Sequence, residues 1–177
     1  MQKKLMLGAI VIVSIVLVGA LINYMHVDSF SFAWALNFML MMCTSIFTEV
    51  LNSELSSSYY DSKNWEQKGK VYEKFGVTIF RKILVLIGWE KVIRKSTPIE
   101  KNTSALKNLY LQTKKSEFNH LIILIIVSVA TVCVAIQYGV IKSLWLVILN
   151  VLLNLYPILL QRYNRPRIAR MLNLSKI

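Results

Sequence analysis

Residues 5–24 read LMLGAIVIVSIVLVGALINY and contain no charged side chain. At a rise of about 1.5 Å per residue, a helix of this length extends over about 30 Å, which is the thickness of the hydrocarbon core of a bilayer. Lys3 and Lys4 precede the segment, as basic residues precede the apolar region of a signal peptide. That region is typically shorter, however, and residues 19–21 form a poor cleavage site. We therefore expect an uncleaved membrane-spanning helix.

Three further apolar stretches have the length and composition of membrane-spanning helices. They cover residues 30–47, 121–138 and 143–160. Only a short turn containing Gly139 separates the last two, so we expect them to form an antiparallel hairpin. The sequence predicts an all-α integral membrane protein with about four transmembrane helices in a single membrane domain, residues 1–177.

The composition agrees with this fold class and narrows the expected partners. Hydrophobic residues make up 55% of the chain, charged residues only 17%, and the net charge is +12. A basic chain can bind nucleic acid, but in a chain this apolar Lys and Arg more often face anionic lipid headgroups. We expect membrane lipid as a partner and no nucleic acid. The sequence gives no indication of an oligomeric state.

Basic residues are distributed unevenly among the connections. The long connection, residues 48–117, contains thirteen Lys and Arg, whereas the two short connections on the opposite side contain only Lys142. Further basic residues lie near both termini. Because cytoplasmic segments retain Lys and Arg, the long connection and both termini are predicted to be cytoplasmic.

Part of the long connection is itself apolar. Residues 71–93 alternate apolar clusters with Lys and Arg, and the longest uncharged run, residues 83–89, is too short to cross a bilayer. An interfacial amphipathic helix or a re-entrant helix fits this pattern. Residues 53–64 have the composition of a loop, and residues 96–98 (Ser-Thr-Pro) mark a second break.

Glu117 and His120 are candidates for catalysis at the predicted cytoplasmic end of the third span. Three residues separate them, so on one helix both side chains project from the same face. A carboxylate in that position can hold and polarise an imidazole, and the pair could then serve as a general base. A polar cap at the membrane interface is the alternative that the spacing leaves open.

A metal site is not expected. Glu-x-x-His also occurs in di-iron helical bundles, but those need the motif twice together with two further carboxylates, and here it occurs once. His26, the other histidine, is predicted to lie across the membrane. Cys43 and Cys133 lie inside apolar runs without the spacing of a zinc site. Neither cysteine neighbours a histidine in sequence, and no Gly-x-Ser-x-Gly motif occurs, so a covalent intermediate on serine or cysteine lacks support.

The fourth span carries a polar stripe. Asn150, Asn154, Pro157 and Gln161 follow one another at offsets of four, three and four residues, which places them along one side of a helix. Unpaired amides are costly in lipid, so this stripe faces protein or a cavity. It could bind a substrate, or it could join the helices through interhelical hydrogen bonds while Pro157 kinks the helix.

Three arginines follow the stripe directly. Arg162, Arg165 and Arg167 bring three guanidinium groups to the membrane face at which Glu117 and His120 are expected. Guanidinium groups suit phosphate or carboxylate ligands. A basic run after a span is also the ordinary positive-inside signal. The expected hairpin favours the functional interpretation, because it returns the arginines and the histidine to one surface.

These motifs resemble the bacterial glycosyl-4,4'-diaponeurosporenoate acyltransferase family. The resemblance lies in residues 113–120 (TKKSEFNH), in Asn154-x-x-Pro157 and most specifically in residues 161–167 (QRYNRPR). A weaker similarity lies in residues 65–72 (WEQKGKVY), an aromatic-Glu-x-x-Gly pattern. The resemblance covers roughly the last two thirds of the chain. It implies a bacterial cell-membrane enzyme that moves a fatty acyl group from an activated thioester to a hydroxyl of a glycosylated carotenoid or lipid.

The resemblance also implies roles for the candidate residues. His120 would remove the hydroxyl proton, and Glu117 would orient the imidazole. Asn164 or a backbone amide would support the oxyanion. The arginines would hold the phosphates of an acyl-CoA or acyl carrier protein, which is a co-substrate, so no other cofactor is expected. The expected substrate-binding residues are Arg162, Asn164, Arg165, Arg167, Asn154 and Gln161.

Two other classes of protein compete with the enzyme. A non-enzymatic membrane assembly or interaction protein would explain the basic connection and the polar stripe. It would not explain why a histidine, a carboxylate and three arginines are expected at one surface. A transporter usually needs an ionisable group deep in the bilayer, and the cores of the four expected spans contain no Asp, Glu, Lys or Arg.

Overall fold

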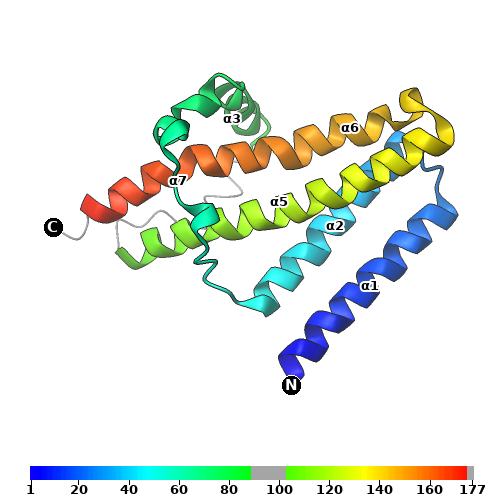
Figure 1. Cartoon of the computed structure of the whole chain (residues 1–177), viewed down its shortest axis with the longest axis horizontal. Coiled ribbons are helices and arrows are strands. Elements are labelled where there is room, and N and C mark those ends of the chain that lie inside the picture. The colour runs from blue at the N-terminus through cyan, green and yellow to red at the C-terminus, as the bar shows by residue number, and fades with distance from the viewer. Residues whose placement is uncertain (89–102, 175–177) are drawn as a thin grey trace. The chain divides into compact units, whose positions relative to one another are not determined.

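The computed structural model describes residues 1–88 and 103–174, and within them every regular element is helical (Figure 1). Four helical segments are long and apolar enough to cross a membrane: Gln2–Tyr24, Phe30–Leu51, Thr103–Tyr138 and Val140–Asn173. The prediction of an all-α membrane protein with four such helices is confirmed. The elements in chain order are α1 (Gln2–Tyr24), α2 (Phe30–Leu51), η1 (Ser58–Tyr60), η2 (Asn64–Glu73), α3 (Val77–Leu86), α5 (Thr103–Tyr138), η3 (Val140–Ser143), α6 (Leu144–Asn150), η4 (Val151–Leu155) and α7 (Tyr156–Leu174).

The chain divides into two compact units. Unit 1 comprises Met1–Ser53 and Phe118–Leu155, and unit 2 comprises Glu54–Glu117 and Tyr156–Ile177. The long helix α5 contributes its first part to unit 2 and the rest to unit 1. Residues 103–117, which the sequence analysis assigned to the connection, are therefore helical.

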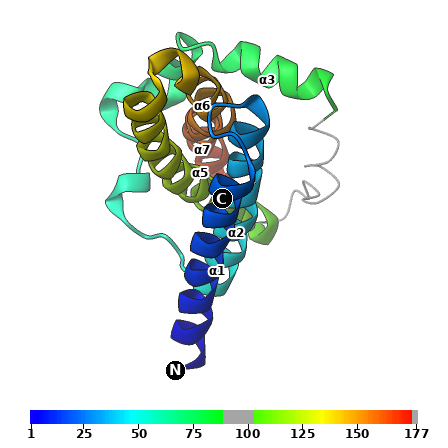
Figure 2. The ribbon, with the colours of Figure 1, turned by 90° about the vertical axis from the view of Figure 1, so that its right-hand side faces the viewer.

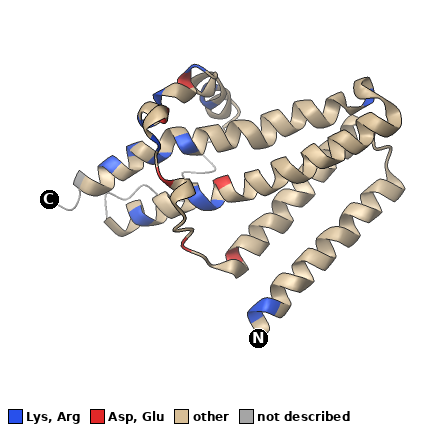
Figure 3. Cartoon of the chain, in the orientation of Figure 1, with Lys and Arg blue, Asp and Glu red and all other residues tan. Residues whose placement is uncertain are grey.

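Unit 1 contains the apolar helices α1, α2 and α6 and the apolar part of α5. Its segments 30–48, 118–141 and 143–155 carry no Asp, Glu, Lys or Arg (Figure 3). α5 and α6 lie side by side in both views (Figures 1 and 2). The core between α2, α5 and α6 consists of Phe32, Ala33, Leu36, Leu40, Ile123, Val127, Val134, Leu146 and Leu149.

Local signals fix the ends of the unit 1 helices. α2 starts where the Ser29 hydroxyl accepts a hydrogen bond from the Phe32 amide at 3.1 Å, which is an ordinary N-cap. The ammonium of Lys142 donates to Asp28 at 2.8 Å. This ion pair joins the α1–α2 connection to η3, so both short connections lie at the same end of the unit.

The helix α1 packs beside α2 but buries no residue completely. Large apolar side chains such as Ile12 and Ile15 are exposed along it. A helix that is apolar on every side and exposed to this extent is suited to lipid and not to water.

Unit 2 is built on α7. Val77 at the start of α3 and Tyr72 of η2 form a small core with Tyr163 of α7, and the rings of Phe80 and Tyr156 stack 5.1 Å apart. α3 is ten residues long, so it extends over about 15 Å and is too short to cross a bilayer.

The outer side of α3 is amphipathic. Ile79, Ile83 and Leu86 are exposed at helical spacing, and Arg81 and Lys82 are exposed beside them. This is the pattern of the interfacial helix expected within residues 71–93. Residues 89–93 and the predicted break at residues 96–98 lie outside the described residues.

Gly69 lets η2 approach the backbone of α7. It adopts a φ of +91°, and a Cβ atom at this position would lie 2.9 Å from the carbonyl oxygen of Tyr163 and 3.2 Å from its Cα. Both atoms belong to the backbone of a helix and cannot move aside. The glycine of the aromatic-Glu-x-x-Gly pattern is therefore explained by a close approach of two backbones.

We expect Gly69→Ala to destabilise unit 2 by several kcal/mol, because a positive φ costs an alanine about 1–2 kcal/mol and the clash adds about 1–3 kcal/mol. The measurement is the thermal denaturation midpoint of the detergent-purified protein. Gly88→Ala is the matched control, since Gly88 has a φ of +77° but no atom of the described residues within 4 Å of its Cβ position. Equal losses in the two variants would show that the contact with Tyr163 contributes nothing.

Candidate functional site

The carboxylate of Glu117 is fully buried in unit 2, with 0% of its side chain exposed. Arg162 and Arg165, three residues apart on α7, project from the same face toward it. Nε of Arg162 donates to Oε1 of Glu117 at 2.7 Å, and Nη2 of Arg165 donates to Oε2. Each carboxylate oxygen therefore has a charged donor, which is the strong form of hydrogen bond.

A second carboxylate joins this cluster. Oε1 of Glu66 accepts from Nη1 of Arg162 and from the hydroxyl of Tyr72, both at 2.6 Å, and Oε2 accepts from the amide of Lys63 at 2.9 Å. Burial disfavours the ionised form, but the hydrogen bonds from Tyr72, Lys63 and Arg162 outweigh it and hold the pKa of Glu66 below its ordinary value. Burial, followed by the bond to Glu66, raises the pKa of the Tyr72 phenol.

Every side-chain nitrogen of the two arginines in this cluster donates to a protein group. Arg165, which is buried, also donates to the carbonyl of Tyr60 and to the hydroxyl and carbonyl of Thr113 at 3.1–3.2 Å. Arg162 donates to the carbonyl of Tyr59 and lies 4.5 Å from the centre of its ring. Two guanidinium groups and two carboxylates give the cluster no net charge. We call Glu66, Glu117, Arg162 and Arg165 the buried charge cluster.

Arg167 differs from the other two arginines. Its side chain is 40% exposed, and its ion pair with Glu73, itself 45% exposed, has a separation of 3.3 Å. The guanidinium group also stacks on the ring of Tyr163, 3.5 Å from its centre. Arg167 is therefore held in place by an aromatic ring while one side of it stays accessible.

The remaining predicted residues of unit 2 lie on α7 as well. The side chain of Gln161 donates to the hydroxyl of Ser116 on α5 at 3.1 Å. Asn164 is half-buried, and its side chain makes no hydrogen bond to the other described residues. The oxyanion role expected for Asn164 stays a prediction.

His120 belongs to unit 1, where it meets a chain of asparagines. Its ring is half-buried, and Nδ1 lies 3.3 Å from Oδ1 of Asn154 in η4. Nδ2 of Asn154 donates to Oδ1 of Asn37 at 2.6 Å and to Oδ1 of Asn150 at 2.8 Å. Nδ2 of Asn150 donates in turn to the carbonyl of Leu124 and to the hydroxyl of Ser128, both at 3.1 Å. We call His120, Asn154, Asn37 and Asn150 the amide relay.

The backbone near Asn154 departs from an ordinary α-helix. Residues 151–155 form a π-helical turn, η4, and Pro157 follows it. Proline has no amide hydrogen, so the carbonyl of Leu153, four residues earlier, lacks its usual helical donor. The spacing Asn154-x-x-Pro157 thus places the side-chain neighbour of the imidazole in a π-helical turn next to a proline.

The structure gives Glu117 and His120 different partners from those that the spacing predicted. Glu117 pairs with Arg162 and Arg165, and His120 meets Asn154. Glu117, Gln161, Arg162 and Arg165 come together in unit 2, whereas His120 and Asn154 come together in unit 1.

Sequence reasoning missed Asn37 and Glu66 as site residues. An amide inside the apolar run of residues 30–47 was a usable signal for Asn37, because such a group needs a partner within the protein. The aromatic-Glu-x-x-Gly pattern contained Glu66, but nothing local to that pattern indicates Arg162 as its partner.

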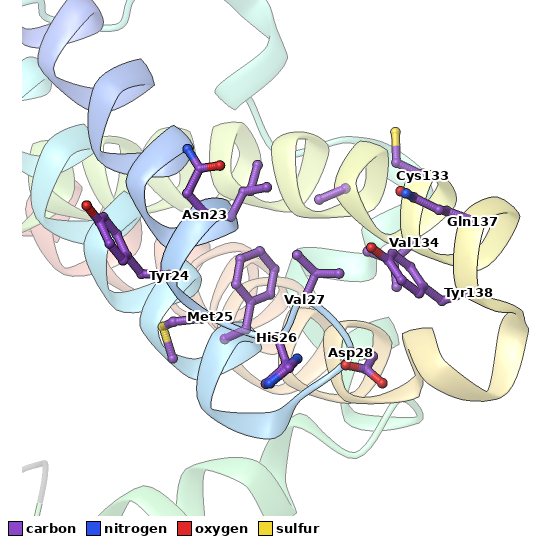
Figure 4. Close-up of a pocket in the computed structure, with 13 residues that line it drawn as sticks. Asn23, Tyr24, Met25, His26, Val27, Asp28, Cys133, Val134, Gln137 and Tyr138 are labelled. Carbon is purple, nitrogen blue, oxygen red and sulfur yellow. The ribbon is translucent and has the colours of Figure 1, made fainter.

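A cavity of about 690 Å³ lies at the other end of unit 1 (Figure 4). His26 and Asp28 from the α1–α2 connection line it, together with Cys133, Gln137 and Tyr138 of α5. Tyr138 lies about 27 Å from His120 along α5. This cavity is therefore not part of the surroundings of His120. Among the described residues, no group of three or more His, Cys, Asp and Glu side chains could hold a metal ion.

The family model for glycosyl-4,4'-diaponeurosporenoate acyltransferase matches residues 56–174. The chain belongs to this family. The match covers the buried charge cluster, α5, the asparagines of α6 and η4, and α7, which confirms the resemblance seen in the sequence motifs. The helices α1 and α2, with Asn37, lie outside the matched residues. No curated protein and no solved structure matches the chain.

We expect Glu117→Gln to destabilise unit 2 by about 3–5 kcal/mol, because it leaves the buried guanidinium group of Arg165 and the largely buried one of Arg162 facing one remaining carboxylate. The measurement is the thermal denaturation midpoint in detergent. Glu73→Gln is the matched control, since it breaks the exposed pair with Arg167 and should cost less than about 1 kcal/mol. Similar midpoints for the two variants would mean that the buried charge cluster does not stabilise unit 2.

Proposed function

We propose that this acyltransferase moves a fatty acyl group from a thioester, acyl-CoA or acyl carrier protein, to a sugar hydroxyl of a carotenoid glycoside. The observation that carries the proposal is the imidazole of His120, positioned by Asn154 at the edge of an apolar helical unit in a member of this family. We propose the cytoplasmic face as the location, because the long connection and both termini hold nearly all the basic residues.

In the proposed reaction His120 acts as the general base. The hydroxyl oxygen of the sugar attacks the thioester carbonyl while its proton passes to the imidazole. The carbon–oxygen bond forms, the tetrahedral intermediate collapses with cleavage of the carbon–sulfur bond, and the imidazolium returns the proton to the thiolate. The products are an ester and a free thiol, so the reaction needs no further reactant.

Several features support His120 in this role over other side chains. Imidazole is the side chain whose ordinary pKa lies closest to neutrality, so it can both accept and return a proton. His26, the other histidine, lines the cavity at the far end of unit 1. The apolar helices give the acyl tail and the polyisoprenoid chain a lipid environment, so only their polar ends need to meet in the site.

Arg167 is the best candidate among the three arginines for holding the phosphates of the donor. Arg162 and Arg165 are neutralised within the buried charge cluster, whereas the pair between Arg167 and Glu73 is exposed and can exchange for another anion. A guanidinium fork held over the Tyr163 ring suits a phosphate group.

Replacing His120 by alanine should lower the rate of acyl transfer by about 10²–10⁴-fold, which is the usual contribution of a general base. The acylated glycoside is quantified by mass spectrometry of cells that express each variant at matched membrane abundance. His26→Ala is the matched control and should keep wild-type product levels. If His120→Ala retains wild-type activity, the catalytic proposal is wrong, and a membrane assembly or interaction protein becomes the better explanation.

Replacing Arg167 by alanine should raise the KM for acyl-CoA about tenfold, the effect of losing roughly 1.4 kcal/mol of binding to a phosphate. The KM for an acyl-N-acetylcysteamine thioester, which has no phosphate, should not change. Arg170→Ala removes a neighbouring exposed arginine and should leave both values unchanged. An equal rise for both donors in Arg167→Ala would contradict a contact with phosphate.

A further inference from the structure

In the amide relay, the donor and the acceptor of each hydrogen bond between the asparagines can be assigned. The assignment begins with two backbone carbonyls. Nδ2 of Asn37 donates to the carbonyl of Ala33 at 2.8 Å, and Nδ2 of Asn150 donates to the carbonyl of Leu124 at 3.1 Å. A carbonyl oxygen can only accept, so the nitrogen end of each amide must point toward it. The oxygen ends of Asn37 and Asn150 are therefore free to face Asn154.

These two oxygens fix the orientation of Asn154. Oδ1 of Asn37 and Oδ1 of Asn150 lie 2.6 Å and 2.8 Å from Nδ2 of Asn154, which has exactly two hydrogens to donate. The reversed amide would place an oxygen against two oxygens in a buried position. Asn154 therefore presents Oδ1, an acceptor, to the ring of His120.

The tautomer of His120 follows from this orientation. Nδ1 lies 3.3 Å from an atom that can only accept, so this contact is a hydrogen bond only when Nδ1 carries the hydrogen of the neutral imidazole. Nε2 then carries the lone pair. The hydrogen position is thus determined by the direction of three amides and not by the ring itself.

We propose that Asn154, held by Asn37 and Asn150, is a positioning residue that fixes His120 as the tautomer protonated on Nδ1. Nε2 is then the atom that accepts the proton of the sugar hydroxyl. This inference rests on the proposed function for its catalytic meaning, but the tautomer itself can be measured without any reaction.

The relay performs this task without a charge. Segments 30–48, 118–141 and 143–155 of unit 1 contain no charged residue, so no charged group of these segments faces the imidazole. A carboxylate at position 154 would be buried next to the side-chain oxygens of Asn37 and Asn150. The amide of Asn154 also presents an oxygen to Nδ1, and its two hydrogens form hydrogen bonds to those two oxygens.

The first experiment is ¹⁵N NMR of histidine-labelled His26→Ala protein in nanodiscs, in which His120 is the remaining histidine. The ¹⁵N shifts at a pH where the imidazole is neutral distinguish a protonated Nδ1 from a protonated Nε2. We expect protonation at Nδ1 in this background. Protonation at Nε2 would overturn the proposal directly, whatever the activity.

Two variants then test the relay. In Asn154→Leu the neutral ring should show both tautomers, and kcat should fall at least about tenfold with little change in KM, as expected when an orienting partner is lost. Ser128→Ala is the matched control: it removes one hydrogen bond from Asn150 but leaves the Leu124 carbonyl to fix the amide, so tautomer and kcat should stay unchanged.

These outcomes separate the two proposals. A single Nδ1-protonated tautomer that becomes mixed in Asn154→Leu supports the relay even if His120→Ala remains active, in which case only the general-base role fails. An unchanged tautomer in Asn154→Leu overturns the relay, and it does so even if His120 proves essential for transfer. If Asn154→Leu does not accumulate, Asn37→Leu is the substitute variant, because it removes one of the two oxygens that orient the amide of Asn154. The neutral ring of His120 should then also show both tautomers.

Discussion

Unit 2 depends on the two ion pairs that the buried carboxylate of Glu117 forms with Arg162 and Arg165. An ionised group with no exposed surface is stable only when opposite charge and hydrogen-bond donors surround it. Arg162 and Arg165 meet that requirement from one face of α7, which ties α7 to α5. Arg162 also forms an ion pair with Glu66, and this pair holds η2 against α7. The close approach of the two backbones at Gly69 follows from that contact. One carboxylate thus explains why residues 65–72, 113–117 and 161–167 occur in the same unit.

Unit 1 meets the corresponding requirement with neutral groups. Asn37, Asn150 and Asn154 come from α2, α6 and η4, and each amide finds its donor and acceptor partners inside the bundle. Such bonds contribute modestly to helix association, but an amide left without a partner in hydrocarbon is costly. The network therefore selects one arrangement of these helices. Because every amide has a fixed direction, the network also determines which atom of His120 faces away from it.

The sequence was sufficient for the four apolar spans and insufficient for the extent of α5 and for the side-chain pairings. An uncharged run such as residues 5–24 has one stable solution in a bilayer, so its helix was predictable from length alone. Residues 103–117 continue α5 with lysines among apolar residues, a pattern that a polar connection shares. For the site, spacing identified Glu117 and His120 correctly as neighbours on one helix, but neighbours on a helix need not be partners. Two guanidinium groups from α7 are stronger partners for a carboxylate than one imidazole. Both lie more than 40 residues from Glu117 in the sequence, so local spacing could not identify them.

The choice of amide or carboxylate beside a catalytic imidazole is set by the surroundings. A carboxylate can orient the ring and stabilise the imidazolium, but where it is buried, as in the Ser-His-Asp triad, hydrogen-bond donors must compensate its charge. Asn154 is 2% exposed among segments without charge, where an isolated anion would be strongly disfavoured. In the proposed mechanism the amide orients the imidazole without storing charge beside it in the resting enzyme. The positive charge then develops only during proton transfer, when the tetrahedral oxyanion provides its counter-charge.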